Sequence, residues 1–229
     1  MDLSTVTHGV SVWFLPVVVA ITFHEAAHGW VADRCGDDTA KALGRVTFNP
    51  IKHVDLFGTL LLPALLLLLE SPVLFGYAKP VPVNFGRLRH PKRDMVWVAL
   101  AGPAINVLLA FVAALLFHTV AYAPPELAPW LGENLNNAIY INVILAVFNM
   151  LPLPPLDGGR VLTGLLPSRA AWRFAQLERY GLLILIGLLF LVPLAAGSLL
   201  GIQFNPLWQV LQPLIRGLYI LVVTLAGQG

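Results

Sequence analysis

Long apolar runs alternate with short polar stretches along the chain, and most of these runs are long enough to cross a bilayer. A spanning helix needs about 20 predominantly apolar residues. Four runs reach that length: Val10–Val31, Met95–Tyr122, Gly181–Leu200 and Pro206–Ala226. The pattern therefore predicts an all-α polytopic membrane protein.

Two shorter runs leave the number of crossings open. The run Leu135–Leu151 contains several asparagines, which favour a helix that faces the interior of a bundle rather than lipid. These asparagines are Asn136, Asn137, Asn142 and Asn149. The run Leu56–Leu69 is interrupted by Pro63, so we expect it to dip into the membrane without crossing. The expected total is five to six transmembrane helices.

The distribution of Lys and Arg predicts how the helices are oriented. These residues gather in the stretches 34–55, 76–94 and 157–179, and the stretch 123–134 has none. Positive loops stay cytoplasmic, so we expect an outer N-terminus and an inward first helix. The Met95–Tyr122 helix should then run outward, the Leu135–Leu151 helix inward, and the last two helices outward and back.

Composition supports a membrane protein and narrows its partners. Hydrophobic residues make up 58% of the chain and charged residues 11%, whereas about a quarter of the residues of soluble proteins are charged. No basic block with interleaved aromatic residues suggests a nucleic acid, and the single Cys35 excludes an internal disulfide and a Cys-based zinc site. We interpret residues 1–229 as a single membrane-embedded domain.

Ionisable residues inside the first apolar run form a candidate metal site. His24 and His28 are four residues apart, so they share one helix face and can bind one metal ion. Glu25 is placed to accept a proton from a water at that metal, which is the H-E-x-x-H arrangement of zinc proteases. A pair of histidines beside a salt-bridged glutamate is the structural alternative. Ionisable groups within a span are costly without compensation, and this favours the metal.

A third ligand is expected after the Leu135–Leu151 run, because a catalytic zinc has three protein ligands and one open position. A proline-rich bend at 152–155 precedes Asp157, and two glycines follow it. Prolines and glycines can fix the backbone so that Asp157 points back at the bundle. By itself, Asp-Gly-Gly indicates only a turn, but the expected topology places His28 and Asp157 near the same cytoplasmic face.

Together these motifs resemble the site-2 protease family of intramembrane zinc metalloproteases, in its compact bacterial form without PDZ or CBS domains. The resemblance rests on His24-Glu25-x-x-His28 and on the segment Asn149–Gly158. Three further motifs support it: Asn49–Thr59, Gly76–Asn84 and Gly102-Pro103-x-x-Asn106. The core motifs span residues 22–160, and the two helices within 180–226 are accessory.

The resemblance implies a zinc metalloendopeptidase that carries one Zn²⁺ and cuts single-span membrane proteins within or near their transmembrane segments. By the same resemblance, the chain is expected in a bacterial inner membrane with its active site near the cytoplasmic face. Asp157 would be the third zinc ligand beside His24 and His28, and Glu25 the general base. Asn106 and Asn149 would hold the substrate carbonyl or stabilise the oxyanion.

The resemblance also implies a re-entrant β-hairpin at Gly76–Asn84 that receives the unwound substrate. Prolines belong on edge strands, and an edge can accept an added strand. A plain proline-rich loop is the alternative. The expected substrate-binding residues are Lys79, Pro80, Val81, Pro82, Val83 and Asn84.

Other interpretations of the polar residues remain open. His53 and Asp55 form either a second metal site or a pair that holds a loop, and the loop is favoured because one zinc suffices. For the whole chain, the alternatives are a membrane metal carrier or zinc-dependent scaffold and a protease relative that binds helices without cutting. A carrier is expected to have polar positions along a path, often in repeated halves, and the chain has one cluster and no internal repeat.

Overall fold

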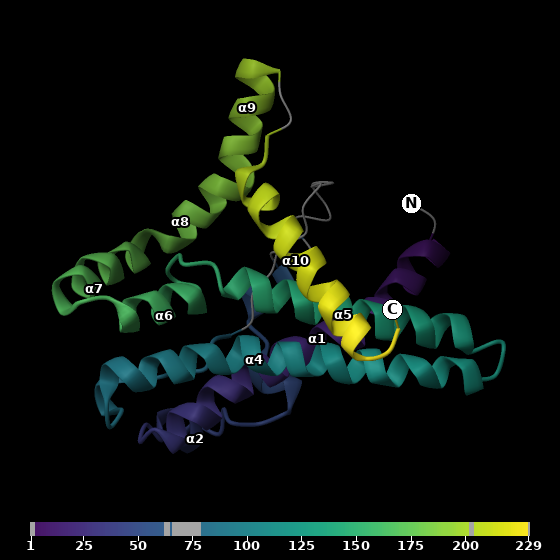
Figure 1. The fold of residues 1–229 in the computed structure, drawn as a ribbon, viewed down its shortest axis with the longest axis horizontal. Coiled ribbons are helices and arrows are strands. Elements are labelled where there is room, and N and C mark those ends of the chain that lie inside the picture. The colour runs from purple at the N-terminus through teal and green to yellow at the C-terminus, as the bar shows by residue number, and fades with distance from the viewer. Residues whose placement is uncertain (1–2, 62–64, 66–78, 202–203, 229) are drawn as a thin grey trace.

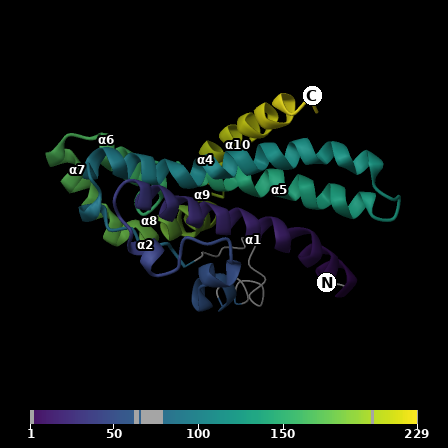
Figure 2. The same cartoon turned by 90° about the horizontal axis from the view of Figure 1, so that it is seen from below.

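The computed structural model describes residues 3–61, 65, 79–201 and 204–228, and this part of the chain is helical without a β-strand. Three long helices form its core: α1 (Leu3–Arg34), α4 (Pro91–Phe117) and α5 (Ala128–Asn149). Figures 1 and 2 show them running side by side along the long axis of the molecule. The predicted all-α architecture is confirmed for the described residues.

Contacts between the core helices define their relative directions. His8 pairs with Glu133 at 2.8 Å and the Asn137 amide donates to Val12 O at 3.1 Å, so α1 and α5 are parallel. In α4 the order is reversed, because His24 contacts Asn106 whereas His28 contacts Val98. The predicted alternation of the first three core helices is therefore confirmed.

Small side chains allow close approach at the centre of this bundle. Alanines from α1, α4 and α5 are buried, and they are Ala20, Ala110, Ala114 and Ala146. Membrane helices pack closely where small residues meet. Asn142 is buried between them, as its predicted interior position requires, whereas Asn136 is exposed on the side of α10.

Four helices of the described part are long and apolar enough to span a membrane. They are Thr7–Arg34, Pro91–Tyr122, Ser168–Leu199 and Pro206–Leu225, and they match the four long runs in the sequence. Helix α5 is not one of them, although it lies alongside α4. The chain is thus an integral membrane protein, and its described part has four candidate spanning helices rather than the expected five to six.

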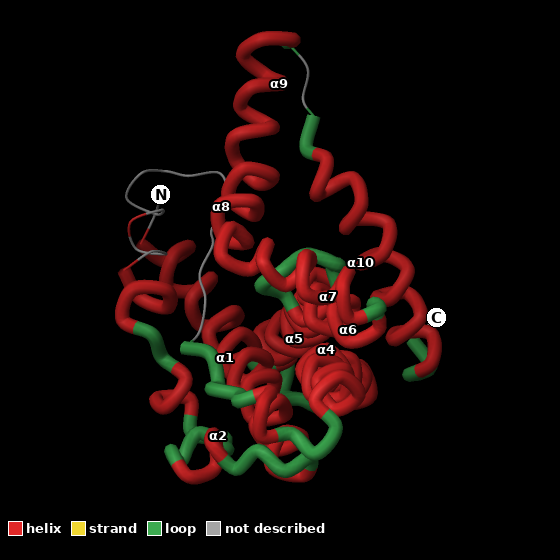
Figure 3. The backbone as a smooth tube through the Cα atoms, turned by 90° about the vertical axis from the view of Figure 1, so that its left-hand side faces the viewer, coloured by secondary structure: helices red, strands yellow, loops and turns green. Residues whose placement is uncertain are grey.

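The C-terminal part leaves the core and then returns to it (Figures 1 and 3). Three short helices lead away: α6 (Asp157–Leu165), α7 (Ser168–Ala175) and α8 (Gly181–Ile186). Between them, Gln176–Tyr180 is a 3₁₀-helix, and Gly187–Leu191 is a π-helical turn that leads into α9 (Val192–Leu200). The last helix, α10 (Pro206–Leu225), crosses α5 and begins at an Asn205 side chain that accepts the Trp208 N–H.

The predicted direction of α10 is wrong. The His118 ring donates to Ala226 O at 2.8 Å and the Gln228 amide donates to Ala114 O, so α10 ends beside the end of α4. The two helices are therefore parallel, not antiparallel as the expected return inward requires. Residues 181–215 contain no Lys or Arg, so loop charge carried no information about this last helix.

The predicted re-entrant segments are only partly described. Leu56–Leu61 forms a short π-helix whose first turn is capped by Asp55 Oδ1, which accepts the N–H groups of Phe57 and Gly58. Residues 62–64 and 66–78, with the first half of the expected hairpin, lie outside the described residues. The described half, Lys79–Asn84, forms no strand and leads into a 3₁₀-helix at Phe85–Arg87. The backbone N–H groups of Val81 and Asn84 donate to the side chains of Glu25 and Asp37 rather than to a neighbouring strand.

Candidate metal centre

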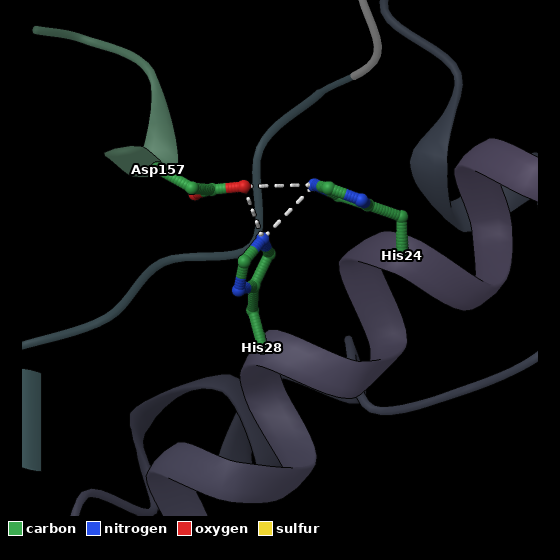
Figure 4. Close-up of side chains that lie close together, drawn as sticks. All are labelled: His24, His28 and Asp157. Carbon is green, nitrogen blue, oxygen red and sulfur yellow. Dashed lines mark hydrogen bonds and ion pairs between the residues drawn. The ribbon is translucent and has the colours of Figure 1, made fainter. Parts of the chain in front are cut away.

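The side chains of His24, His28 and Asp157 converge in the interior of the bundle (Figure 4). The two imidazoles project from successive turns of α1, and their Nε2 atoms are 3.0 Å apart. Asp157 is the first residue of α6, and its Oδ2 lies 3.2 Å from His24 Nε2 and 3.3 Å from His28 Nε2. All three residues are at most 7% exposed. The structure thus brings together the three predicted metal ligands.

Glycines after Asp157 allow the chain to fold back to this position. A Cβ on Gly158 would overlap the carbonyl oxygens of Met150 and Leu151, and a Cβ on Gly159 would lie 2.5 Å from Pro154 N. Real Cβ atoms do not approach backbone so closely. The tight bend between α5 and α6 therefore requires glycine at both positions, and it carries the carboxylate back toward α1.

Gly102 allows the backbone of α4 to lie against the two imidazoles. A Cβ at this position would be 2.5 Å from His24 Cε1 and 2.5 Å from His28 Nε2. The helix supplies no side chain here, so the space beside the Nε2 atoms stays open. Sequence reasoning placed Gly102 in a motif but gave it no role, because nothing local shows what the residue faces.

Hydrogen bonds at Nδ1 orient both imidazoles. His24 Nδ1 lies 2.5 Å from Asn106 Oδ1, and His28 Nδ1 lies 2.7 Å from Val98 O. The amide of Asn106 donates to Asn142 Oδ1 at 2.7 Å and to Ala20 O at 3.2 Å, so its oxygen must face His24. Both Nδ1 atoms therefore donate a proton, and in the neutral rings both Nε2 atoms present lone pairs to each other.

This arrangement fits a tetrahedral zinc ion. Ligands at about 2.0–2.1 Å from zinc are about 3.3–3.4 Å apart in a tetrahedron, close to the 3.0, 3.2 and 3.3 Å between the three atoms. Asp157 Oδ2 is buried and accepts no hydrogen bond among the described residues. Two lone pairs and a carboxylate oxygen that face one another need a cation between them, and this donor set suits zinc.

Electrostatics at Asp157 agree with a site built for positive charge. Burial raises the pKa of this carboxyl, but positive charge and hydrogen bonding from His28 and His24, when these imidazoles are protonated, outweigh burial and hold the pKa well below its usual range. The carboxylate thus stays ionised when it faces a positive charge, whether a proton on an imidazole or a metal ion. An ionised carboxylate is the form that binds metal.

Glu25 lies beside the ligands and is oriented by the backbone of another segment. Its Oε2 accepts the N–H of Val81 at 2.7 Å. No hydrogen bond of the described residues uses Oε1. One carboxylate oxygen is therefore fixed, and the other remains available to exchange a proton.

Two buried charged residues in the stretch that follows α1 hold the segment Lys79–Asn84 in place. Arg45 donates to Lys79 O at 2.8 Å and to Pro80 O at 3.4 Å. The Asn84 N–H donates to Oδ2 of the fully buried Asp37 at 2.6 Å. Sequence reasoning missed both charged residues, because Arg45 and Asp37 lie in a polar stretch that resembles an ordinary solvated loop.

The two asparagines that sequence analysis assigned to catalysis have different surroundings. Both N–H groups and the oxygen of the Asn106 amide are engaged, by Ala20, Asn142 and His24 respectively. Asn149 is half-buried and donates to Leu145 O of its own helix at 3.0 Å. Their roles toward a substrate stay predictions, and the observed contacts give Asn106 a positioning role at His24.

His53 belongs to loop structure rather than to a second metal group among the described residues. Its Nε2 donates to Thr47 O at 2.9 Å, and its carbonyl accepts the Lys79 N–H at 2.9 Å. Asp55 caps the turn that follows it. These bonds support the loop-holding interpretation.

Comparison with known proteins identifies relatives of the chain. The sequence profile described as peptidase family M50 matches residues 12–127 and 130–194. YwhC of Bacillus subtilis, named as a candidate zinc metalloprotease, is 40% identical over 186 residues, which cover 80% of this chain and 81% of YwhC. Rip2 of Mycolicibacterium smegmatis, named in the same way, is 31% identical over 173 residues, which cover 75% of this chain and 64% of Rip2. No solved structure gives a significant match.

Proposed function

The chain belongs to peptidase family M50, the site-2 protease family of zinc metalloproteases, and from this premise we propose that it hydrolyses peptide bonds within or near transmembrane segments of single-span membrane proteins. The observation that carries the proposal is the convergence of the three ligand atoms within 3.3 Å of one another, beside a spanning helix that carries His24, Glu25 and His28. A bacterial inner membrane, with the site near its cytoplasmic face, is part of the proposal.

His24, His28 and Asp157 would hold the zinc ion and leave one position open. A zinc ion bound there supplies a Lewis acid that polarises the substrate carbonyl and makes water a better nucleophile near neutral pH. Asn106 and Val98 keep the Nε2 atoms directed at the site through their bonds to Nδ1. These bonds maintain the geometry throughout the reaction.

Glu25 would move the proton. The bond from Val81 holds Oε2, so Oε1 accepts the proton of the attacking water and later delivers it to the leaving amine nitrogen. Both steps need a carboxylate in a fixed position, which the backbone donor provides. The same bond links the general base to the segment that is expected to receive the substrate.

An unwound substrate would lie along Lys79–Asn84. No hydrogen bond to another described residue uses the carbonyls of Val81, Pro82 and Val83. Alternate carbonyls of an extended segment point to opposite edges, so a substrate strand can pair with Val81 and Val83 on one edge or with Pro82 on the other. Pro80 and Pro82 have no N–H, which keeps the second edge from pairing fully with a strand. The hydrogen bonds to Arg45 and Asp37 hold the segment Lys79–Asn84 beside Glu25.

Cleavage of a synthetic single-span substrate by the purified full chain in detergent tests the proposal. Zinc content and cleavage are measured for the native protein and for Glu25→Gln, which keeps the ligands and removes the base. We expect about one zinc per chain in both proteins, and a cleavage rate that falls by about 100-fold or more in the variant.

Three results would contradict the proposal in different ways. Zinc in both proteins with cleavage by neither, across several substrates, favours a metal carrier or a scaffold, and zinc uptake into proteoliposomes then tests the carrier. Equal cleavage by both proteins would remove Glu25 as the general base. The absence of metal from the native protein would overturn the ligand assignment itself. The described residues contain one group able to bind a metal, whereas a carrier is expected to show a path of such groups.

A further inference from the structure

A cavity of about 300 Å³ lies between α5 and α10 and shares no residue with the metal centre. Its wall from α5 contains Asn136 and Tyr140, and its wall from α10 contains polar side chains at helical spacing. Those on α10 are Trp208, Gln212, Arg216 and Tyr219. The cavity is unusual because its polar side lies within two helices of the membrane bundle.

Hydrogen-bond donors dominate this cavity. The Tyr219 hydroxyl donates to Asn136 Oδ1 at 2.8 Å, which leaves the Asn136 amide group as a donor. Among the described residues, no hydrogen bond or ion pair uses the guanidinium of Arg216, the amide of Gln212 or the indole N–H of Trp208. The cavity therefore presents a positive charge and several donors without an anionic acceptor.

Arg216 needs a partner because of its position. It lies in the candidate spanning helix Pro206–Leu225, and its side chain is exposed on the surface of the protein. A charged side chain within a membrane is costly and is normally paired or faces the interior of a bundle. The residues of α5 that face it, Asn136 and Tyr140, are uncharged, and no acidic side chain of the described residues pairs with it, which favours a complementary group from outside this part of the chain.

The depth of the cavity excludes most lipid headgroups as that partner. Arg216 lies ten residues after Pro206 and nine residues before Leu225, which places it about 15 and 14 Å from the two ends of the candidate spanning helix α10 at 1.5 Å per residue. The headgroups lie outside a hydrocarbon core of about 30 Å. A phosphate at either surface is thus farther from this depth than an arginine side chain extends.

A second copy of the chain offers no suitable acid among the described residues. Glu25 belongs to the metal centre, and Glu133 pairs with His8 near the start of α5 at 2.8 Å. Asp33 and Asp94 lie near the ends of their helices, where Asp33 pairs with Lys41 and Asp94 with Arg93, and Glu178 pairs with Arg160 at 3.6 Å. Within the part of the chain that the structure describes, no acid of a spanning helix is thus left for Arg216, which favours an anion carried by another protein.

We propose that the α5–α10 cavity is a docking site for a membrane-spanning helix of a partner protein that carries an Asp or Glu side chain near its middle. The carboxylate accepts the hydrogen bonds of Arg216, whose planar guanidinium suits two-pronged pairing with a carboxylate. The amides of Gln212 and Asn136 and the indole of Trp208 complete the set of donors. The site then selects partner helices by the depth of their acidic residue.

Binding of synthetic spanning helices to the full chain in phosphatidylcholine vesicles tests this proposal. Energy transfer between labelled partners measures affinity for two Leu/Ala-rich helices that differ only at the central residue, Glu in one and Gln in the other. The chain carries Glu25→Gln, so that cleavage cannot remove the probe. We expect the Glu helix to bind about ten-fold more tightly than the Gln helix, the size expected for polar pairing between membrane helices.

Three variants show whether Arg216 carries this preference. Arg216→Leu should abolish it, Arg216→Lys should retain part of it, and Arg169→Leu, which removes an exposed arginine from α7, should leave it unchanged. Equal zinc content in all variants shows that they are folded. The proposal would be overturned if the protein with native Arg216 bound the Glu and Gln helices equally. It would also be overturned if Arg216→Leu kept the full preference for the Glu helix.

The same vesicles distinguish a lipid from a helix. If phosphatidylglycerol added to the vesicles protects the protein from thermal unfolding only when Arg216 is present, and the Glu helix has no advantage, the cavity binds a lipid headgroup and the proposal is wrong. Because the assay measures binding in an inactive background, its failure would leave the proposed protease activity untouched.

Discussion

Oδ1 of Asn106 lies 2.5 Å from Nδ1 of His24, so a residue of α4 fixes the orientation of a metal ligand on α1. The Asn106 amide is itself held by Asn142 and by the backbone of Ala20. The bonds form a chain across all three core helices, and they tie the geometry of the metal centre to the packing of the bundle.

Replacing Asn106 by Leu should weaken zinc binding. The substitution leaves the His24 N–H without its acceptor, and loss of such a supporting bond typically lowers metal affinity by about 10–100-fold. Zinc affinity is measured by competition with a chelator, and cleavage is measured with and without added zinc. If excess zinc restores cleavage, the residue positions His24. Unchanged affinity with lost cleavage would instead favour the predicted role at the substrate carbonyl.

Asn149→Leu is the matched control for this variant. Asn149 bonds within its own helix, to Leu145 O, so zinc affinity should stay within about two-fold of the native value, the usual result when a change touches no contact of the site. A drop in cleavage alone would then support the predicted catalytic role of Asn149. A drop in zinc affinity would show that the two asparagines are coupled.

Gly102→Ala should damage the metal centre although it adds a single methyl group. That methyl would lie 2.5 Å from His24 Cε1 and His28 Nε2, and relief of such overlap costs about 1–3 kcal/mol or a shift of the helix. We expect zinc content and cleavage both to fall. Gly197→Ala in α9 adds the same group where no atom lies within 4 Å, and it should change neither property.

Removal of the metal should lower the stability of the folded protein. Without a cation, the Nε2 atoms of His24 and His28 and the Asp157 carboxylate face one another at 3.0 to 3.3 Å. A ligand that binds only the folded state stabilises it by about 2.7 kcal/mol at 100 times its dissociation constant. Zinc added to chelator-treated protein should raise the unfolding temperature measured in detergent. Asp157→Ala should show a much smaller rise, and an equal rise would contradict the assignment of this ligand.

Asp37→Asn should loosen the segment beside Glu25. Burial raises the pKa of Asp37, but the hydrogen bonds from Thr39 and from the Asn84 N–H outweigh burial and hold the pKa below its usual range. The carboxylate is therefore charged above its ordinary pKa, and its bonds are lost only as the pH falls below that range. The Asn side chain turns one acceptor into a donor, which leaves Thr39 or Asn84 without a partner.

The expected result for Asp37→Asn is slower cleavage with unchanged zinc content. A lost bond to a buried acceptor costs about 1–3 kcal/mol, which should appear as lower resistance to proteolysis between residues 79 and 84. Asp38→Asn is the control, because Asp38 pairs with Arg87 at 2.9 Å on the surface, and such pairs contribute about 0–1 kcal/mol. Equal effects of the two substitutions would show that the buried Asp37 carboxylate does not hold the segment Lys79–Asn84 in place for cleavage.

The sequence by itself determined the features that depend on local spacing. The four apolar runs of sufficient length predicted the four candidate spanning helices of the described structure, because the thickness of the bilayer sets the length of a helix. The expected total of five to six was higher because it added two shorter runs. His24 and His28 were predicted as a pair because residues four apart share a helix face. Asp157 was predicted as the third ligand from family motifs. Loop charge supported it, because the expected topology places the end of the Leu135–Leu151 run at the level of His28.

Only the tertiary structure decided the features that depend on which helix lies against which. The direction of α10 became clear only from its contacts with the end of α4, because the stretch that precedes α10 contains no Lys or Arg from which loop charge could predict it. Several contacts of the site join segments that are distant in the chain. They are the hydrogen bonds of Asp37 and Arg45 to the segment Lys79–Asn84, the bond of Asn106 to His24, and the close approach of Gly102 to both imidazoles. No local pattern encodes such pairings, because burial and hydrogen bonding become defined only when the helices pack.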